Sequence, residues 1–170
     1  MPAMQRLFLI GVVISMLAIA GCGGDSSTTS SSPGEEGTAT EQDGGLEVKT
    51  RPQVKPPQGP PPKKIVTREI EEGSGPAAKA GDVVTVQYVG VNYRTGTEFD
   101  ASWNRGEPFP FKLGAHEVIS GWDIGIEGMK VGGRRELIIP PNHAYGSTGS
   151  PPAIPPNETL IFVVDLEAIN

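Results

Sequence analysis

The sequence predicts an α+β fold in which an antiparallel β-sheet packs against one short helix. Residues 83–93 alternate apolar and polar side chains, as half-buried strands do, and residues 159–166 form an apolar strand-like run. Only residues 118–126 place apolar side chains at helical spacing. Several strands with one short helix favour a sheet that covers the helix on one face.

The elements can be placed in order along the chain. Domain-like patterning begins at Lys63, and a Gly- and Pro-containing break follows at residues 72–76. Residues 94–96 predict a turn, and residues 140–157 predict a long loop with six prolines. The expected strands are residues 83–93, 108–113, 134–139 and 159–166.

The helix is expected where Val118, Trp122 and Ile126 recur every four residues. Ser120, with an aspartate three residues later, predicts a side-chain cap at its start. Gly128 predicts its end, because glycine readily adopts the left-handed conformation that closes helices.

The charge excludes one class of partner. The chain has 14 Lys and Arg against 20 Asp and Glu, a net charge of −6. A nucleic-acid-binding protein needs a basic surface to neutralise phosphates, and this composition provides none. We therefore expect no nucleic-acid partner.

Residues 1–21 predict a signal peptide, with Arg6 followed by an apolar run at 7–20 that is short for a membrane-spanning helix. The ending Ile-Ala-Gly-Cys at 19–22 resembles the lipobox of bacterial lipoproteins. That resemblance implies cleavage before Cys22, lipidation of its thiol and an extracytoplasmic, membrane-anchored protein. The alternative is an ordinary signal peptide followed by an unmodified thiol.

Residues 22–62 predict a disordered tether after the lipidated cysteine. Of the 40 residues from 23 to 62, 24 are Gly, Pro, Ser or Thr and four are aliphatic, too few to offset the entropy of ordering the chain. A proline-rich ligand for SH3-type domains is the alternative for this stretch. Residues 63–170 are expected to form one domain, a monomer whose core suffices without a disulfide.

Short blocks between residues 64 and 167 occur together in one order. They are VQYVG at 86–90, FDAS at 99–102, PF at 108–109, LG at 113–114, EVISGWD at 117–123, MKVG at 129–132, AYG at 144–146, IPPN at 154–157 and TLIF at 159–162. Together they resemble the FKBP family, the tacrolimus- and rapamycin-binding peptidyl-prolyl isomerases. The resemblance implies a half-barrel antiparallel sheet wrapped over a short helix, with the substrate proline in an aromatic pocket.

The resemblance also assigns roles to individual positions. Trp122 corresponds to the pocket floor, and Asp100 to a pocket carboxylate that Tyr88 and Arg105 support. The backbone N–H of Ile119 and the hydroxyl of Tyr145 correspond to donors that hold substrate carbonyls. The remaining pocket positions are Phe99, Phe109, Val118, Ile154 and Phe162.

Two positions on the lip of the pocket depart from the family pattern. Ser150 stands where histidine is common, and Ala153 where a bulkier aliphatic residue is common. These changes bear on substrate preference and macrolide affinity more than on activity.

The chemistry implied by the resemblance requires no metal or cofactor. Rotation about an X-Pro bond opposes amide resonance, with a barrier of about 18–20 kcal/mol, and breaks no bond. A dry pocket favours the twisted amide, which has the smaller dipole, and donors hold the flanking chain. The expected function is isomerisation during the folding of exported proline-containing proteins.

Other interpretations remain open from the residues alone. From periodicity alone, the aromatic residues are expected to be ordinary core residues. Without the family resemblance, Asp100 could equally be a carboxylate that caps a turn. The altered lip keeps a second function class open, a non-catalytic FKBP-like chaperone or peptide-binding module. His116 and His143 receive no role.

Overall fold

A computed structural model describes residues 49–170, which belong to one compact unit. The predicted signal peptide, Cys22 and residues 23–48 of the predicted tether lie outside the described residues. Within residues 49–170, no helix is both long and apolar enough to cross a membrane.

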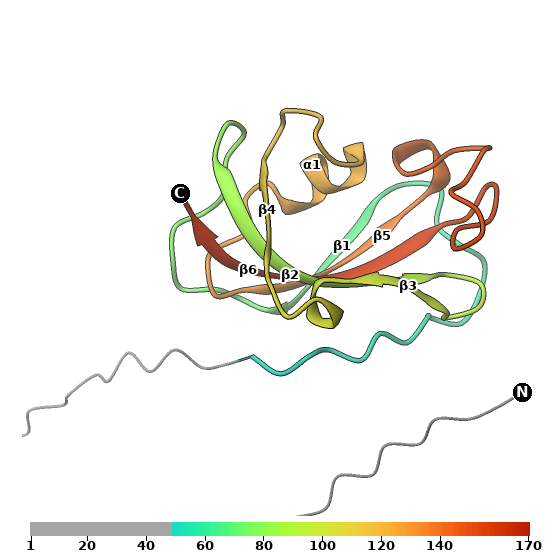
Figure 1. Cartoon of the computed structure of the whole chain (residues 1–170), viewed down its shortest axis with the longest axis horizontal. Coiled ribbons are helices and arrows are strands. Elements are labelled where there is room, and N and C mark those ends of the chain that lie inside the picture. The colour runs from blue at the N-terminus through green and yellow to red at the C-terminus, as the bar shows by residue number, and fades with distance from the viewer. Residues whose placement is uncertain (1–48) are drawn as a thin grey trace, which may run out of the picture. The chain divides into compact units, whose positions relative to one another are not determined.

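The predicted α+β class is confirmed. Six antiparallel strands form one sheet in the order β1-β5-β6-β2-β3, and β4 also pairs with β2. Figure 1 shows the sheet curving around α1 (Ser120–Ile126), the one α-helix of residues 49–170. The strands are β1 (Val66–Glu71), β2 (Val83–Asn92), β3 (Glu98–Ala101), β4 (Phe109–Lys112), β5 (Arg134–Ile139) and β6 (Leu160–Ile169), and two 3₁₀ turns are η1 (Ser102–Asn104) and η2 (Pro141–His143).

The alternation of side chains along the strands gives the sheet two apolar faces. On β5, Leu137 and Ile139 are fully buried in the main core with Trp122 of the helix. Ile138, between them, belongs to a second cluster on the other side of the sheet. Adjacent residues of a strand point to opposite faces, so the sheet has an inner, helix-covered face and an outer face.

Two glycines let α1 approach β5 closely. A Cβ on Gly125 would lie 2.8 Å from Leu137, and a Cβ on Gly121 would clash with Ile139. Glycines at i and i+4 share one side of a helix, which explains why this side can rest directly on the strand. The contact fixes the height of the helix above the sheet and therefore the depth of the space beside it.

The predicted start of α1 is wrong in its capping. Ser120 is the first helical residue rather than the cap, and Ile119 precedes it without a side-chain cap. The Ser120 hydroxyl contacts His143, and Asp123 accepts a hydrogen bond of 2.8 Å from the Gly114 N–H. Both side chains serve long-range contacts that a local capping rule does not consider.

The structure also differs from the sequence prediction at residues 49–60, which we call the strap. The strap runs along the outer face of the sheet, opposite α1 (Figure 1). Its Val54 packs against the outer cluster formed by six residues of β2, β3, β5, β6 and the β2–β3 turn: Val89, Val91, Tyr93, Ala101, Ile138 and Ile161. Its composition predicts disorder, but composition does not register an apolar surface supplied by distant strands.

Candidate functional site

A cavity of about 430 Å³ lies between the start of α1 and the inner face of the sheet. Ten of the residues predicted for the pocket line it, together with Glu117, which the sequence analysis did not single out. Ile154 does not line it but is buried in the adjoining core. The lining residues are Tyr88, Phe99, Asp100, Arg105, Phe109, Glu117, Val118, Ile119, Trp122, Tyr145 and Phe162.

The aromatic rings form a continuous packed surface around Trp122. The ring centroids of Tyr88 and Phe162 lie 4.9 and 5.3 Å from that of Trp122, both at nearly perpendicular angles. Phe99 meets Phe162 edge to face at 5.5 Å. Edge-to-face packing is favourable for aromatic pairs, so the pocket wall and the core are one structure.

Gly90 of β2 makes this wall possible. A Cβ at this position would lie 2.7 Å from Phe99 and 2.8 Å from Phe162. A larger residue would therefore push both rings toward the cavity.

Asp100 is the centre of a polar group at the edge of the aromatic surface. The Tyr88 hydroxyl donates a 2.5 Å hydrogen bond to Oδ2 of Asp100, and Arg105 donates one of 2.6 Å to Oδ1. Arg105 also donates to the Tyr88 hydroxyl at 2.9 Å. Tyr88, a neutral donor, thus fixes one oxygen of the carboxylate, and Arg105, a charged donor, fixes the other.

Burial and the hydrogen bond to Asp100 raise the pKa of Tyr88 to about 12. The hydrogen bonds to Tyr88 and Asp100 raise the pKa of Arg105. At neutral pH, Tyr88 is therefore a neutral donor and Arg105 a cation beside the cavity.

A buried serine shapes the turn that carries this group. The Ser102 hydroxyl accepts a 2.8 Å hydrogen bond from the Tyr88 N–H and donates one to the Gln87 side chain. The Arg105 N–H bonds to the Ser102 carbonyl at 2.9 Å, which closes η1. Ser102 thereby ties β2 to the segment that carries Asp100 and Arg105.

The two predicted substrate donors, the backbone N–H of Ile119 and the hydroxyl of Tyr145, also belong to residues that line the cavity. The Ile119 N–H precedes α1, and neither it nor the Tyr145 hydroxyl bonds to another group within residues 49–170. Burial and then the negative charge of Asp100 raise the pKa of Tyr145, so its hydroxyl stays protonated at neutral pH. Both groups can donate to a carbonyl in the cavity.

His143 is a residue that sequence reasoning missed. Its Nδ1 lies 3.2 Å from the Ser120 hydroxyl, which joins η2 to the first residue of α1. Ser120 follows Ile119, and Tyr145 lies two residues after His143. The contact therefore links the segments that carry the two donors, but the 23-residue separation left no local signal.

The loop that carries the two predicted lip residues, Ser150 and Ala153, is held from β2, but neither residue lines the cavity. The Asn92 side chain donates a 3.0 Å hydrogen bond to the Ala153 carbonyl, and the backbones of Ser150 and Ile154 bond to each other in both directions. The two positions that depart from the family pattern, Ser150 and Ala153, therefore belong to a hydrogen-bonded loop.

A second cavity, of about 510 Å³, lies between residues 61–63 and parts of the β5–β6 loop. Prolines and small polar residues line much of it, and it has no aromatic side chain. No cluster of three or more potential metal ligands occurs in residues 49–170. The aromatic cavity is therefore the candidate site.

The comparisons identify the family of this fold. Residues 75–167 match the model of the FKBP-type peptidyl-prolyl cis-trans isomerase family. The chain belongs to this family. It is thus a peptidyl-prolyl isomerase of the FKBP type.

Individual relatives agree. The chain is 59% identical over 120 residues to "FK506-binding protein" of Streptomyces anulatus, covering 70% of this chain and 97% of the relative. It is 48% identical to "Probable FK506-binding protein" of Corynebacterium glutamicum, covering 68% and 96%. The Streptomyces match is longer than residues 63–170, so it includes residues upstream of Lys63.

Solved structures confirm the fold. The crystal structure of AtFKBP13 matches with a TM-score of 0.58 and 37% identity, over 62% of this chain and 93% of that chain. The structure of FkpA from Escherichia coli matches with a TM-score of 0.57 and 44% identity, over 62% and 48%.

The geometry suits amide rotation. An apolar pocket takes a proline ring out of water and disfavours the planar amide, whose larger dipole loses solvation. Donors at Ile119 and Tyr145 can hold a flanking carbonyl while the other side of the bond turns. The structure brings these groups together, and their individual catalytic roles stay predictions.

Proposed function

We propose that this isomerase acts on proline-limited folding steps of exported proteins while anchored outside the membrane through a lipid on Cys22. It works as a monomer and uses no cofactor. Its clients are unfolded or partly folded proline-containing segments, and FK506- or rapamycin-like macrolides occupy the same cavity.

The observation that carries the catalytic part is the combined presence of an aromatic floor at Trp122, a fixed carboxylate at Asp100 and free donors at Ile119 and Tyr145 in one cavity. The location rests on the lipobox-like sequence at 19–22. The macrolide ligands rest on the names of the relatives, which are FK506-binding proteins.

The test of catalysis is a protease-coupled assay on a proline-containing peptide with the purified full-length protein. We expect the cis fraction to convert faster than in buffer, and FK506 to inhibit the conversion. The refolding of an exported protein with a slow proline-limited phase serves as the client test.

A non-catalytic peptide-binding module is the second candidate, favoured by the altered lip at Ser150 and Ala153. Binding of the peptide without any acceleration of its isomerisation would select this candidate. The lip can be examined separately with Ser150→His, which introduces the residue common in the family.

The anchor is tested with Cys22→Ala. We expect the variant to leave the membrane fraction, either as an unprocessed precursor or as a soluble protein, because no thiol remains to be acylated. A variant that is processed normally and stays membrane-bound would overturn the anchor.

A further inference from the structure

The strap is fixed to the domain at both ends and in the middle. At its start, Lys49 lies 3.0 Å from Glu71, and the Thr50 carbonyl accepts a 2.8 Å hydrogen bond from Arg134. At its end, the Pro60 carbonyl accepts a hydrogen bond of 3.3 Å from Tyr93. Between these points, Pro52, Val54 and Pro56 are half-buried, whereas Gln53, Lys55 and Pro57 are exposed.

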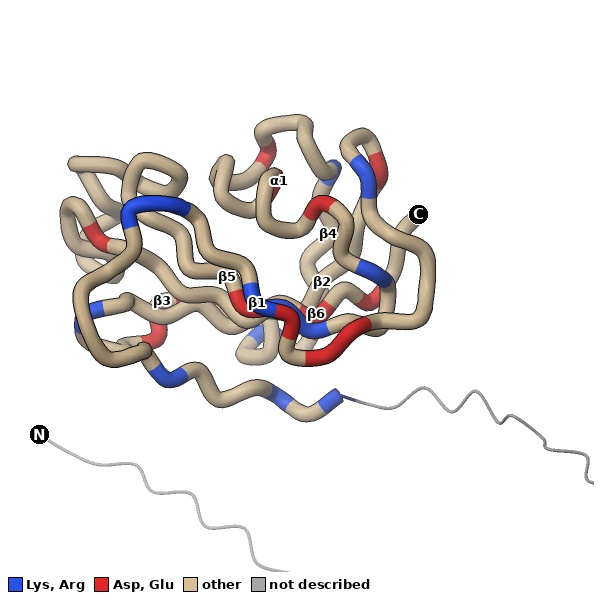
Figure 2. Tube along the Cα trace, turned by 180° about the vertical axis from the view of Figure 1, so that it is seen from behind, with Lys and Arg blue, Asp and Glu red and all other residues tan. Residues whose placement is uncertain are grey.

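The strap is basic, and the domain against which it packs is acidic. The strap, residues 49–60, contains three basic and no acidic residues, whereas residues 61–170 contain ten basic and 14 acidic residues. Figure 2 marks these charges along the backbone. An acidic domain attracts a basic segment, and part of that attraction is screened by salt.

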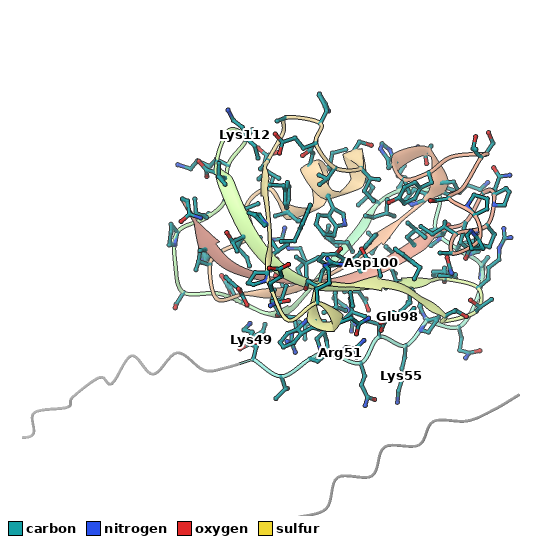
Figure 3. The ribbon with its side chains drawn as sticks, in the orientation of Figure 1. Lys49, Arg51, Lys55, Glu98, Asp100 and Lys112 are labelled. Atoms are coloured by element: carbon teal, nitrogen blue, oxygen red, sulfur yellow. The ribbon has the colours of Figure 1, made fainter. Side chains whose placement is uncertain are left out.

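One ion pair joins the strap to the segment that builds the pocket. Arg51 Nη2 lies 2.5 Å from Glu98 Oε2, and the Asn104 side chain donates 2.8 Å to the other oxygen of Glu98. Figure 3 shows Arg51 beside Glu98, while Lys55 points away from the sheet. Glu98 begins β3 and Asn104 ends η1, so this carboxylate connects the strap to both ends of the segment 98–104.

Apart from the strap, the backbone of this segment is held from β2 alone, through strand pairing and through Ser102. β3 is the last strand of the sheet order, has four residues and pairs only with β2, with a shift of register between Gly90 and Val91. It carries Phe99 and Asp100, and Arg105 follows η1 directly. An edge strand lacks a second neighbour to hold its position.

The apolar contact acts at the same place. Val54 packs on the outer cluster, which includes Ala101 at the end of β3. Trp103 of η1 packs against the same cluster. Without Val54, part of this outer surface would be exposed to water.

We propose that the strap is a positioning segment of the isomerase, which braces β3 and η1 from the outer face and so holds Phe99, Asp100 and Arg105 at the cavity. The domain that catalyses efficiently then begins near Lys49 instead of Lys63. This inference rests on the isomerase function, and binding of FK506 gives it a readout that does not require turnover.

The test compares Arg51→Ala and Val54→Asp with the control Lys55→Ala in the full-length protein. Lys55→Ala removes the same charge from an outward-facing position of the same segment. We expect Arg51→Ala and Val54→Asp to lower kcat/KM and FK506 affinity at least threefold at 25 °C, and Lys55→Ala to leave both unchanged. Arg51→Lys should retain most of the wild-type kcat/KM and FK506 affinity.

Salt and charge exchange separate positioning from general stability. The difference between the wild type and Arg51→Ala should shrink in 1 M NaCl, and Arg51→Glu combined with Glu98→Arg should recover affinity relative to either single change. If Val54→Asp does not fold, Arg51→Ala at an exposed site decides the matter. A lowered melting temperature with unchanged kcat/KM and FK506 affinity would overturn the proposal.

If the wild type binds FK506 but does not catalyse, the isomerase proposal fails while the affinity comparison still tests the strap. If the wild type catalyses and all three variants match it, only the strap proposal fails.

Discussion

The Tyr88 hydroxyl and the Asp100 carboxylate, which come from neighbouring strands, form a 2.5 Å hydrogen bond at the edge of the aromatic cavity. Arg105 completes the group by donating to both residues. The carboxylate is therefore available to a ligand in one fixed orientation, with its charge balanced by the guanidinium.

Asp100→Val should fold and should weaken FK506 binding by about tenfold or more, because it removes a fixed charged acceptor while keeping much of the shape. The value of kcat/KM should fall as well. Isothermal titration and the peptide assay measure the two effects, with Glu107→Gln as an exposed carboxylate control. Wild-type affinity and rate in the folded variant would contradict a role for Asp100.

Tyr145→Phe should lower kcat/KM by roughly three- to thirtyfold, because it deletes one substrate hydrogen bond worth about 0.5–1.5 kcal/mol, or somewhat more in a dry pocket. The hydroxyl bonds to no group in the described part of the chain, so the melting temperature should change little. A normal rate together with a lower melting temperature would make Tyr145 structural.

The stability should depend on pH through Tyr88. Its pKa is raised to about 12, whereas a tyrosine in the unfolded chain titrates near 10, so the folded state retains a proton that the unfolded state loses between these values. The free energy of unfolding is fully supported by this group below pH 10 and falls as the pH rises toward 12. Urea midpoints at pH 9 and pH 11 should differ less in Tyr88→Phe than in the wild type; equal slopes would refute this.

Ser120 and His143 should act as a pair. Loss of their contact loosens η2 from α1, so Ser120→Ala and His143→Ala should each lower kcat/KM roughly two- to tenfold, as one hydrogen bond allows. The double variant should be no worse than the more affected single variant. His116→Asn, at an exposed histidine outside this contact, is the control. Additive losses in the double variant would show that the two residues act independently.

Trp122→Ala should lose both stability and activity. The indole is 4% exposed and contacts rings of the pocket and of the core, and removing such a side chain costs about 3–5 kcal/mol. Chemical unfolding measures this loss, and Trp122→Phe should recover part of it. A fully stable Trp122→Ala protein would show that the floor is separate from the core.

Local patterns were sufficient for much of the fold. The predicted strand at 134–139 coincides with β5, and the alternation at 83–93 differs from β2 by one residue. Apart from the exposed Val83, the residues of these strands are half-buried or buried, so their side-chain pattern reflects their surroundings. The family resemblance, rather than periodicity, grouped the aromatic residues around Trp122.

The missed features depend on residues far apart in the chain. Ser120 has the sequence signature of a cap, but its hydroxyl contacts the ring of His143, which lies 23 residues further along the chain. Val54 is one of few aliphatic residues in its stretch, and the surface that receives it comes from four strands and the β2–β3 turn. A rule based on local sequence treats each segment as if it were surrounded by water, whereas these segments pack against a surface formed by distant parts of the chain.

The course of the strap on the outer face has a practical consequence for handling the molecule. Lys49, the first described residue, lies at the outer face of the sheet, on the side away from α1 (Figure 3). An affinity tag or a surface linker placed there would leave the mouth of the pocket open to a bulky client. The same linker in the loop between η2 and β6, next to Tyr145, would obstruct it.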